Sequence, residues 1–509
     1  MSFHFPRKFL AAATAAALLL GGTVFAAGNV RLATALAPNS LQPAEATGLP
    51  DAAVIRTMFE GLVGFLDGEL VTELAESWSS NDDATAYTFT LRPGVTFHDG
   101  TPFNADAVKT YYEWVLDPDN SGARGRSQLK DIATIDVLGD LEVRINLKQP
   151  NGAFIYLLGT SNARIASPAS LTQYPDDLAR HPVGTGPFKF VSWAEGQSVV
   201  VERNADYWGE TAKVDGLEFI VVTNAATRVA MLQSGEVQFI EALPPQLVPV
   251  IQAAQGLDAV STKTNFLRIL QLNTTKAPFN DVRVRHALNY AIDKEQLVNV
   301  AVAGLATVMT APIPAATFGY AEQPAYTYDP EKARSLLAEA GYPNGFEMKV
   351  LTFTGDEYRT VGQVLQQMFS LVGVRMTLDQ QERGALVDQL FKPVDENPTE
   401  AALVGASSST GDADLAITTS FTKASFPPAS NNWSFYENDE VETLVSDARA
   451  TGDQETRAAL YAEALGIIWQ DAPWVFLYSP DSVAGRAATL SGVAYAPDNT
   501  VDARRAELK

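Results

Sequence analysis

Residues 97–108 read FHDGTPFNADAV, and this stretch decides the fold. Its first four residues, at 97–100, have the composition of a turn, because aspartate and glycine favour tight reversals of the backbone. Asn104 then has the side chain of a helix N-cap, and the residues after it predict a helix from Ala105 to about Leu116. A turn and a helix start so close together indicate short connections between the elements of a mixed α and β fold.

Strand patterns lie on both sides of this stretch. Before it, Tyr87, Phe89 and Leu91 alternate with polar residues, and Val95 and Phe97 resume the alternation after a Pro-Gly turn. The same period of two predicts a further strand, at Leu141, Val143, Ile145 and Leu147. The first third of the chain is therefore expected to contain a β-sheet.

Helical sequence patterns predominate after residue 280. Asp281 and the Asp329-Pro330 pair have the composition of helix starts, and the second of these helices is expected to stop at Gly341. Strand-like runs at 348–353 and 374–378 bracket a helical stretch, which predicts a βαβ unit. No low-complexity linker divides the chain, so its domains are expected to be interleaved.

The N-terminus has the features of a secretory signal peptide over residues 1–26. Arg7 and Lys8 are followed by an apolar run at 9–20, and residues 24–26 match the cleavage rule. That run is shorter than the ~20 residues that a membrane-spanning helix needs. Cysteine is absent from the sequence, which excludes disulfides, thiolate metal sites and a lipidated cysteine anchor. We expect a soluble protein free in the periplasm.

Length and charge narrow the class of protein further. A chain of 509 residues is too long for one ordinary core, so two or three domains are expected. Its formal net charge of −23 argues against nucleic acid or an anionic membrane as a partner.

No constellation for catalysis or metal binding is recognisable in the sequence. His98, His181 and His286 have no metal-ligand spacing, and a Gly-x-Ser-x-Gly motif is absent. Asp412 and Asp414 form a close carboxylate pair, but such pairs in loops are usually caps or solvated groups. We therefore expect neither an enzyme nor a bound cofactor.

A polar stretch near the C-terminus has two possible interpretations. Asn432, Trp433 and Tyr436 follow a Pro-Pro pair at 427–428, where a loop is expected. Aromatic rings beside amides suit the wall of a peptide-binding site, because they offer flat apolar area and hydrogen bonds. The alternative is that these side chains anchor the loop to the core.

Six segments together resemble a known family. The chain is similar to the family 5 extracytoplasmic solute-binding proteins of bacterial ABC importers, a resemblance carried by residues 74–78, 97–108, 181–188, 231–236, 280–285 and 338–342. Within this family the C-terminal third looks most like the glutathione-binding members, at residues 407–414, 426–428 and 467–474.

The resemblance implies an α/β fold of the type II (class C) periplasmic binding proteins, a two-lobed flytrap with an additional domain. Lobe I would comprise 27–52, 180–262 and 478–509, the additional domain 53–179, and lobe II 263–477. It also implies a monomer that captures glutathione or a similar short peptide between its lobes and delivers it to an inner-membrane permease and its ATPase. A di- or oligopeptide, a nickel chelate, an opine or an oligosaccharide remains the alternative ligand, and an exported enzyme or chaperone the alternative class.

The resemblance also points to a ligand-binding loop. Aligning residues 411–414 with the Gly-Asp-Pro-Asp of peptide-binding relatives puts their ammonium-binding aspartate at the position of Ser409. A hydroxyl cluster in that place suits a γ-glutamyl head group, whereas Ala406 stands where the family usually has tryptophan. Arg383 is the residue expected to bind the ligand carboxylates, unless it is an exposed arginine paired with a neighbour such as Glu382. The expected ligand-binding residues are Ser407, Ser408, Ser409, Thr410, Asp412, Arg383, Asn432, Trp433 and Tyr436.

Overall fold

The computed structural model describes residues 28–509 except 121 and 124, so the predicted signal peptide lies outside the described residues. Within the described part of the chain, no helix is long and apolar enough to cross a membrane.

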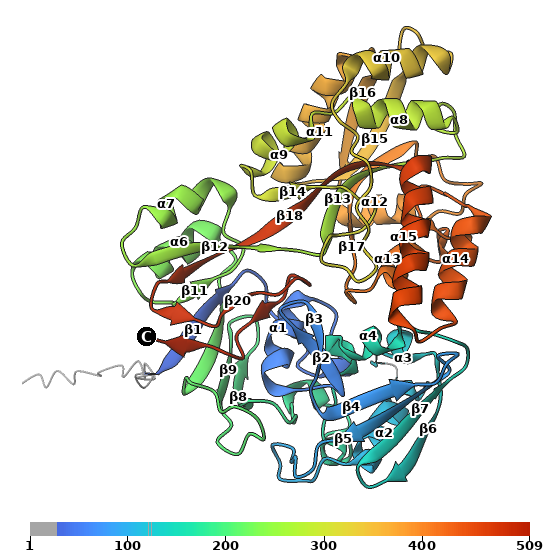
Figure 1. The fold of residues 1–509 in the computed structure, drawn as a ribbon. Coiled ribbons are helices and arrows are strands. Elements are labelled where there is room, and N and C mark those ends of the chain that lie inside the picture. The colour runs from blue at the N-terminus through green and yellow to red at the C-terminus, as the bar shows by residue number, and fades with distance from the viewer. Residues whose placement is uncertain (1–27, 121, 124) are drawn as a thin grey trace, which may run out of the picture.

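One twelve-stranded sheet runs through both lobes of the molecule (Figure 1). Lobe II contributes β13 (Phe266–Leu272), β14 (Ala306–Val308), β15 (Glu347–Phe353), β16 (Arg375–Gln381) and β17 (Ala401–Ser407). Lobe I contributes β1 (Asn29–Thr34), β8 (Phe188–Ala194), β9 (Ser198–Arg203), β10 (Gly216–Val221), β11 (Phe239–Ile240) and β12 (Leu257–Lys263). The last strand, β18 (Trp474–Ala487), is common to both lobes, because it pairs with β13 and β14 in one lobe and with β11 and β12 in the other.

The connection between the lobes is narrow, and hydrogen bonds link its strands. The chain passes from β12 to β13 through Thr264 and Asn265 and returns along β18. Thr264 Oγ1 donates to the Pro480 carbonyl at 2.7 Å, and Ser479 Oγ donates to the Phe266 carbonyl at 2.7 Å. The predicted domain limits stay a prediction, and the one at residues 477/478 falls inside β18.

Helices cover lobe II, and their starts agree with the sequence. Asp281 and Asp329 cap α8 and α10 with their side chains, and α10 ends just before Gly341, whose φ of 94° suits glycine. The predicted βαβ unit is confirmed, since the parallel strands β15 and β16 flank α11. The helices of lobe II are α8 (Val282–Tyr290), α9 (Lys294–Val302), α10 (Pro330–Glu339), α11 (Asp356–Ser370), α12 (Arg383–Leu390), α13 (Ala413–Phe421), α14 (Asp439–Arg449) and α15 (Gln454–Asp471).

The additional domain is built on a four-stranded antiparallel sheet of order β4-β5-β7-β6. Asn104 accepts a hydrogen bond from the Ala107 amide at the start of its main helix, which confirms that predicted N-cap. The predicted strand at 95–97 is wrong: Val95 and Phe97 are buried, but only an isolated bridge at Thr96 forms there. Its elements are β4 (Ala75–Ser80), β5 (Ala86–Leu91), β6 (Ile132–Gly139), β7 (Glu142–Leu147), α2 (Ala105–Leu116), α3 (Arg126–Leu129), α4 (Phe154–Leu158) and α5 (Pro168–Gln173).

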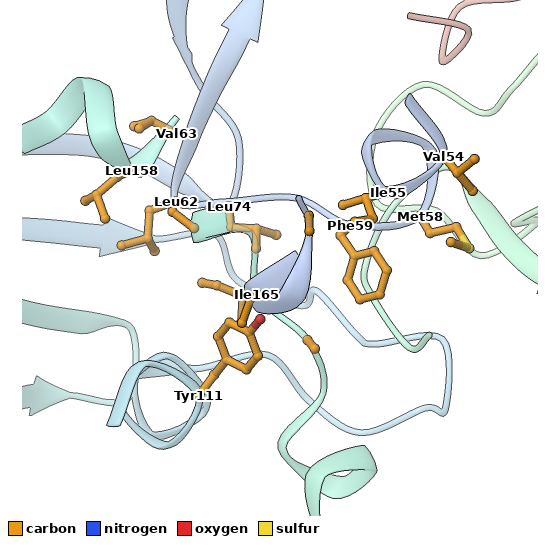
Figure 2. Packing of buried hydrophobic residues seen from close by; sticks show 14 of the residues in the cluster. Val54, Ile55, Met58, Phe59, Leu62, Val63, Leu74, Tyr111, Leu158 and Ile165 are labelled. Atoms are coloured by element: carbon orange, nitrogen blue, oxygen red, sulfur yellow. The ribbon is translucent and has the colours of Figure 1, made fainter. Parts of the chain in front are cut away.

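Lobe I and the additional domain share one hydrophobic core. Buried side chains of β1 and β10 belong to the same cluster as those of β5 and β7. At its centre, α1 (Leu49–Met58) and the residues after it, including Phe59, lie close to Leu74, Tyr111 and Ile165 (Figure 2). Lobe II has clusters of its own. Lobe I and the additional domain therefore form one packed body, and lobe II forms another.

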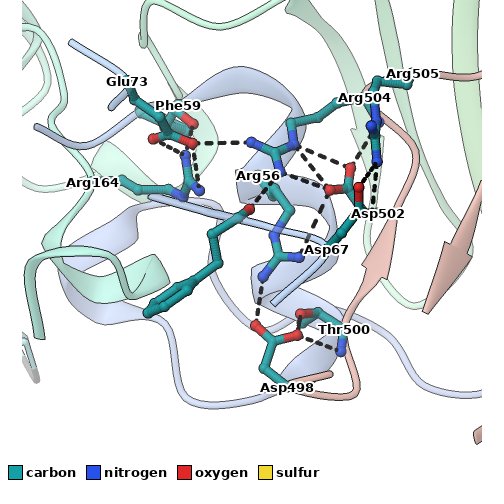
Figure 3. Close-up of polar contacts among 11 residues, drawn as sticks. Arg56, Phe59, Asp67, Glu73, Arg164, Asp498, Thr500, Asp502, Arg504 and Arg505 are labelled. Atoms are coloured by element: carbon teal, nitrogen blue, oxygen red, sulfur yellow. Dashed lines mark hydrogen bonds and ion pairs between the residues drawn. The ribbon is translucent and has the colours of Figure 1, made fainter. Parts of the chain in front are cut away.

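A network of buried charges fastens the C-terminal segment to this first body (Figure 3). Arg504 contacts Glu73 at 3.0 Å and Asp502 at 2.7 Å, while Arg164 holds Glu73 from the other side at 3.1 Å. Burial favours the neutral acid, but the two guanidinium groups outweigh it and hold the pKa of Glu73 below its usual value. Arg56 of α1 contacts Asp498 at 2.5 Å in the same region.

Candidate functional site

A cavity of about 820 Å³ lies between lobe II and the additional domain. One wall comes from α13, α14 and the loop before α13, and the other from the additional domain at residues 128–131 and 149–157. This volume falls within the range of about 300–1,000 Å³ that is typical of small-molecule sites.

Direct contacts between the additional domain and lobe II stand beside this cavity. The Gly152 amide donates to the Arg449 carbonyl at 2.8 Å, and the rings of Tyr156 and Phe318 stack with centroids 5.6 Å apart. Gly152 approaches lobe II so closely that a Cβ there would lie 2.2 Å from the Thr451 carbonyl oxygen. Only glycine allows the two backbones to come this near.

The hydroxyl cluster expected to bind the ligand divides into two kinds of residue. Ser409 is exposed and lines the cavity together with Thr410. Ser408 is fully buried, and its hydroxyl donates to the Asp412 carbonyl at 3.0 Å. Ser407, the last residue of β17, is exposed but is not part of the cavity wall. The structure therefore brings two of the four hydroxyl residues to the cavity.

Asp412 faces the protein interior. Its carboxylate accepts a hydrogen bond from the Asp414 amide at 2.8 Å, which makes it the N-cap of α13, and another from Arg457 Nη2 at 2.7 Å. The side chains of Asp412 and Arg457 are 1% and 0% exposed. Burial raises the pKa of Asp412 to about 6, although Arg457 acts in the opposite direction. Asp412 thus has the capping role that the sequence favours for acids in such a loop.

Asp414 and Arg449 form a second ion pair, and both line the cavity. Arg449 Nε and Nη2 each lie 2.7 Å from one carboxylate oxygen of Asp414, which is a two-pronged contact. Burial disfavours the charge on Arg449, but Asp414 outweighs it and raises the pKa of the guanidinium. Arg449 is not among the residues expected from the sequence. The only signal for it is the pair of acids at 412 and 414, which needs cationic partners that the neighbouring sequence does not supply.

A two-lobed fold with a cavity beside the loop at 407–414 agrees with the comparisons to known proteins. The model of bacterial extracellular solute-binding proteins, family 5 middle, matches residues 69–438. The chain belongs to this family. Its role is that of a solute-binding protein, as the sequence predicted.

Curated family 5 relatives match over the full length. The chain is 37% identical to the glutathione-binding protein GsiB of Pectobacterium atrosepticum, over 99% of this chain and 98% of that protein. It is 36% identical to GsiB of Salmonella typhimurium, over 100% of both.

Solved structures of similar proteins share the fold. HbpA2 from Haemophilus parasuis has a TM-score of 0.85 at 29% identity, covering 94% of this chain and 100% of that one. DppA from Helicobacter pylori, an ABC transporter-associated periplasmic binding protein in complex with the peptide STSA, has a TM-score of 0.75 at 30% identity, covering 94% and 98%. These matches confirm the predicted two-lobed fold.

In this family 5 protein, the residues Asn432, Trp433 and Tyr436 are not part of the cavity wall, although Ser430 just before them is. Asn432 Nδ2 donates to the carbonyls of Thr422 and Tyr436, and the Tyr436 hydroxyl donates to Asp471 at 2.7 Å. Trp433 packs edge-on against another aromatic ring, with centroids 5.7 Å apart. These contacts are those of a loop anchored to the core, and a role of the three residues in ligand binding stays a prediction.

Arg383 begins α12 and is exposed. Its guanidinium lies 5.9 Å from the centroid of the Phe353 ring, and it is not part of the cavity wall. Binding of a ligand carboxylate by Arg383 therefore stays a prediction, and the structure brings a different arginine to the cavity.

Histidines have structural contacts in the part of the chain described by the structure. His98 Nε2 lies 3.0 Å from the Gly186 carbonyl oxygen, and burial lowers the pKa of His98 to about 4. His286 Nε2 lies 2.5 Å from the Gln470 carbonyl oxygen. Among the described residues, no three or more His, Asp or Glu side chains are grouped to hold a metal ion.

Proposed function

We propose that this protein captures glutathione, or a γ-glutamyl peptide close to it, in the periplasm and delivers it to the permease of an ABC importer. The observation that carries the proposal is the position of the cavity: Ser409 and Thr410, from the loop expected to hold the ligand, form part of its wall. Relatives 36–37% identical over the whole chain are named glutathione-binding proteins, which supports this choice of ligand.

Capture depends on movement of lobe II against the body formed by lobe I and the additional domain. The narrow connection at Thr264, Asn265 and β18 is where such a movement would bend, because the cores on its two sides are separate. A ligand that touches both walls of the cavity favours the closed form by the contacts that it makes only there. The permease would then recognise this closed form.

We also propose how the chain is exported and how the mature protein is divided into domains. A signal peptide over residues 1–26 would direct export, and the mature protein would act as a monomer with lobe I at 27–52, 180–262 and 478–509. The additional domain would span 53–179 and lobe II 263–477. The separate cores described above support the boundary between lobe II and the rest of the chain, whereas lobe I and the additional domain share one core.

A thermal-shift screen of the purified, ligand-stripped protein tests the choice of ligand. The panel contains reduced and oxidised glutathione, γ-glutamyl peptides, ordinary di- and tripeptides, an opine, nickel with histidine, and oligosaccharides. A ligand at 100 times its Kd adds about 2.7 kcal/mol to the free energy of unfolding, so its melting shift is readily measured. We expect a shift with glutathione or γ-glutamyl compounds. A shift with another member of the panel alone would refute glutathione as the ligand.

A further inference from the structure

The cavity wall formed by α13 and the residue after it contains threonine hydroxyls whose protons are donated to backbone carbonyls of the same segment. Thr418 Oγ1 donates to the Asp414 carbonyl, Thr419 Oγ1 to the Leu415 carbonyl and Thr422 Oγ1 to the Thr418 carbonyl, each at 2.7 Å. All three threonines line the cavity. A hydroxyl has one proton and two lone pairs, so these groups can offer the cavity only acceptors.

Two cationic residues line the same cavity. Asp414 occupies Nε and Nη2 of Arg449, whereas no residue in the described part of the chain accepts from Nη1. The Arg449 side chain is 35% exposed and forms part of the cavity wall. Lys130, which is exposed, lines the cavity from the additional domain.

The overall charge of the wall is close to balanced. Lys130 and Arg449 are its cationic side chains, and Asp131, Asp414 and Glu442 its anionic ones. A nearly balanced wall suits a ligand that carries both charges, because each charge can find a partner of the opposite kind.

We propose that the cavity binds a zwitterionic peptide with a carboxylate on Nη1 of Arg449 and an N–H or ammonium group on the hydroxyls of Thr418, Thr419 and Thr422. Asp414 acts as a positioning residue, since its two-pronged contact fixes the plane of the guanidinium before the ligand arrives. This inference rests on the proposed function and extends it to the groups of the peptide that are recognised.

Calorimetric titration of the arginine tests the carboxylate contact. The probes are reduced glutathione and its two monoamides, each lacking one carboxylate. We expect Arg449→Gln to raise the Kd of glutathione at least tenfold, and Arg334→Gln, the control at an exposed arginine of α10 outside the cavity wall, to leave it unchanged. One of the two monoamides should bind wild type at least tenfold more weakly than glutathione does. The same monoamide should lose little further affinity in Arg449→Gln, because the partner of the missing carboxylate is already gone.

The hydroxyl wall has its own matched pair of variants. Thr419→Val removes a lone-pair acceptor from the cavity at nearly constant volume. Thr443 of α14 makes the same contact with its own helix, donating to the Asp439 carbonyl at 2.8 Å, but it is exposed and lies outside the cavity wall. We expect Thr419→Val to weaken glutathione binding at least fivefold and Thr443→Val to leave it unchanged.

The outcomes separate this inference from the proposed function. If wild type binds glutathione and Arg449→Gln binds it equally well, the inference is overturned and the proposed function stands. If glutathione does not bind, the proposed function fails. The affinity of the panel member that does bind is then compared with the affinity of its carboxamide. Equal affinity for the two overturns the inference, as does a ligand without a carboxylate. Should Arg449→Gln unfold, two other measurements decide whether the inference holds. One is the affinity of wild type for the monoamides. The other is the affinity of the double variant Asp414→Asn/Arg449→Gln for glutathione, since this variant leaves no unpaired charge.

Discussion

Gly152 offers a direct way to wedge the two bodies apart. A Cβ at this position would lie 2.2 Å from the Thr451 carbonyl oxygen and 2.9 Å from Arg457 Cδ. Ordinary contacts begin at about 3.4 Å, so Gly152→Ala must push the additional domain and lobe II apart by roughly 1 Å. The hydrogen bond from the Gly152 amide to the Arg449 carbonyl, now 2.8 Å, would then exceed bonding distance.

The cost applies to the form in which Gly152 contacts lobe II, which under the proposed function is the closed form. Losing a buried hydrogen bond and leaving both its groups unpaired costs about 2 kcal/mol. If the open form is unaffected, this penalty raises the apparent Kd of the ligand about 30-fold, because tenfold corresponds to about 1.4 kcal/mol. Calorimetric titration with glutathione measures the Kd, and small-angle scattering with saturating ligand reports whether the protein still compacts.

Gly139→Ala is the control for this experiment. Gly139 also lies in the additional domain, but a Cβ there would meet nothing within 4 Å. Its substitution should change neither the affinity nor the scattering. Equal affinities for Gly152→Ala, Gly139→Ala and wild type would refute the reasoning, since the contact at Gly152 would then not belong to the ligand-bound form.

Two further predictions concern stability. Burial lowers the pKa of Lys294 from 10.5 to about 7, so Lys294→Met should raise the free energy of unfolding by about 1–3 kcal/mol at pH 7. The unfolded chain retains the lysine proton between pH 7 and 10 whereas the folded protein does not, so wild type gains stability across that window and the advantage of the variant should shrink; urea titrations at pH 7 and 10 check this, and a constant advantage would contradict it. Arg504→Met removes a cation from Glu73 and Asp502, and it should cost about 3 kcal/mol, seen as a lower Tm, whereas an unchanged Tm would show that the network is dispensable.

Local signals in the sequence were sufficient for much of the fold. The caps at Asn104, Asp281 and Asp329 depend on a side chain and an amide two or three residues away, so they can be read from a short segment. The strand expected at Val95 and Phe97 failed because alternating burial does not require a partner strand: both side chains enter the core from a loop.

The candidate site was less accessible to prediction from sequence. The partners of Asp412 and Asp414 lie 45 and 35 residues away, on helices whose approach is set by the packing of lobe II. Within the hydroxyl cluster, Ser408 turns inward and Ser409 outward, which depends on the path of the loop after β17. No local pattern distinguishes these neighbours, and for the same reason Arg449 was missed.

Strand β18 has a consequence for the synthesis of this protein. β18 comprises residues 474–487 and lies between β13 and β11, so the sheet in both lobes stays incomplete until nearly the whole chain has been made. A chain that ends before residue 474 would leave β13 and β11 with unpaired edges, which are templates for aggregation. Such long-range pairing also folds slowly, which keeps a nascent chain extended for longer. Truncated products should therefore be insoluble in both halves at once, and neither lobe is expected to survive as a fragment of the natural chain.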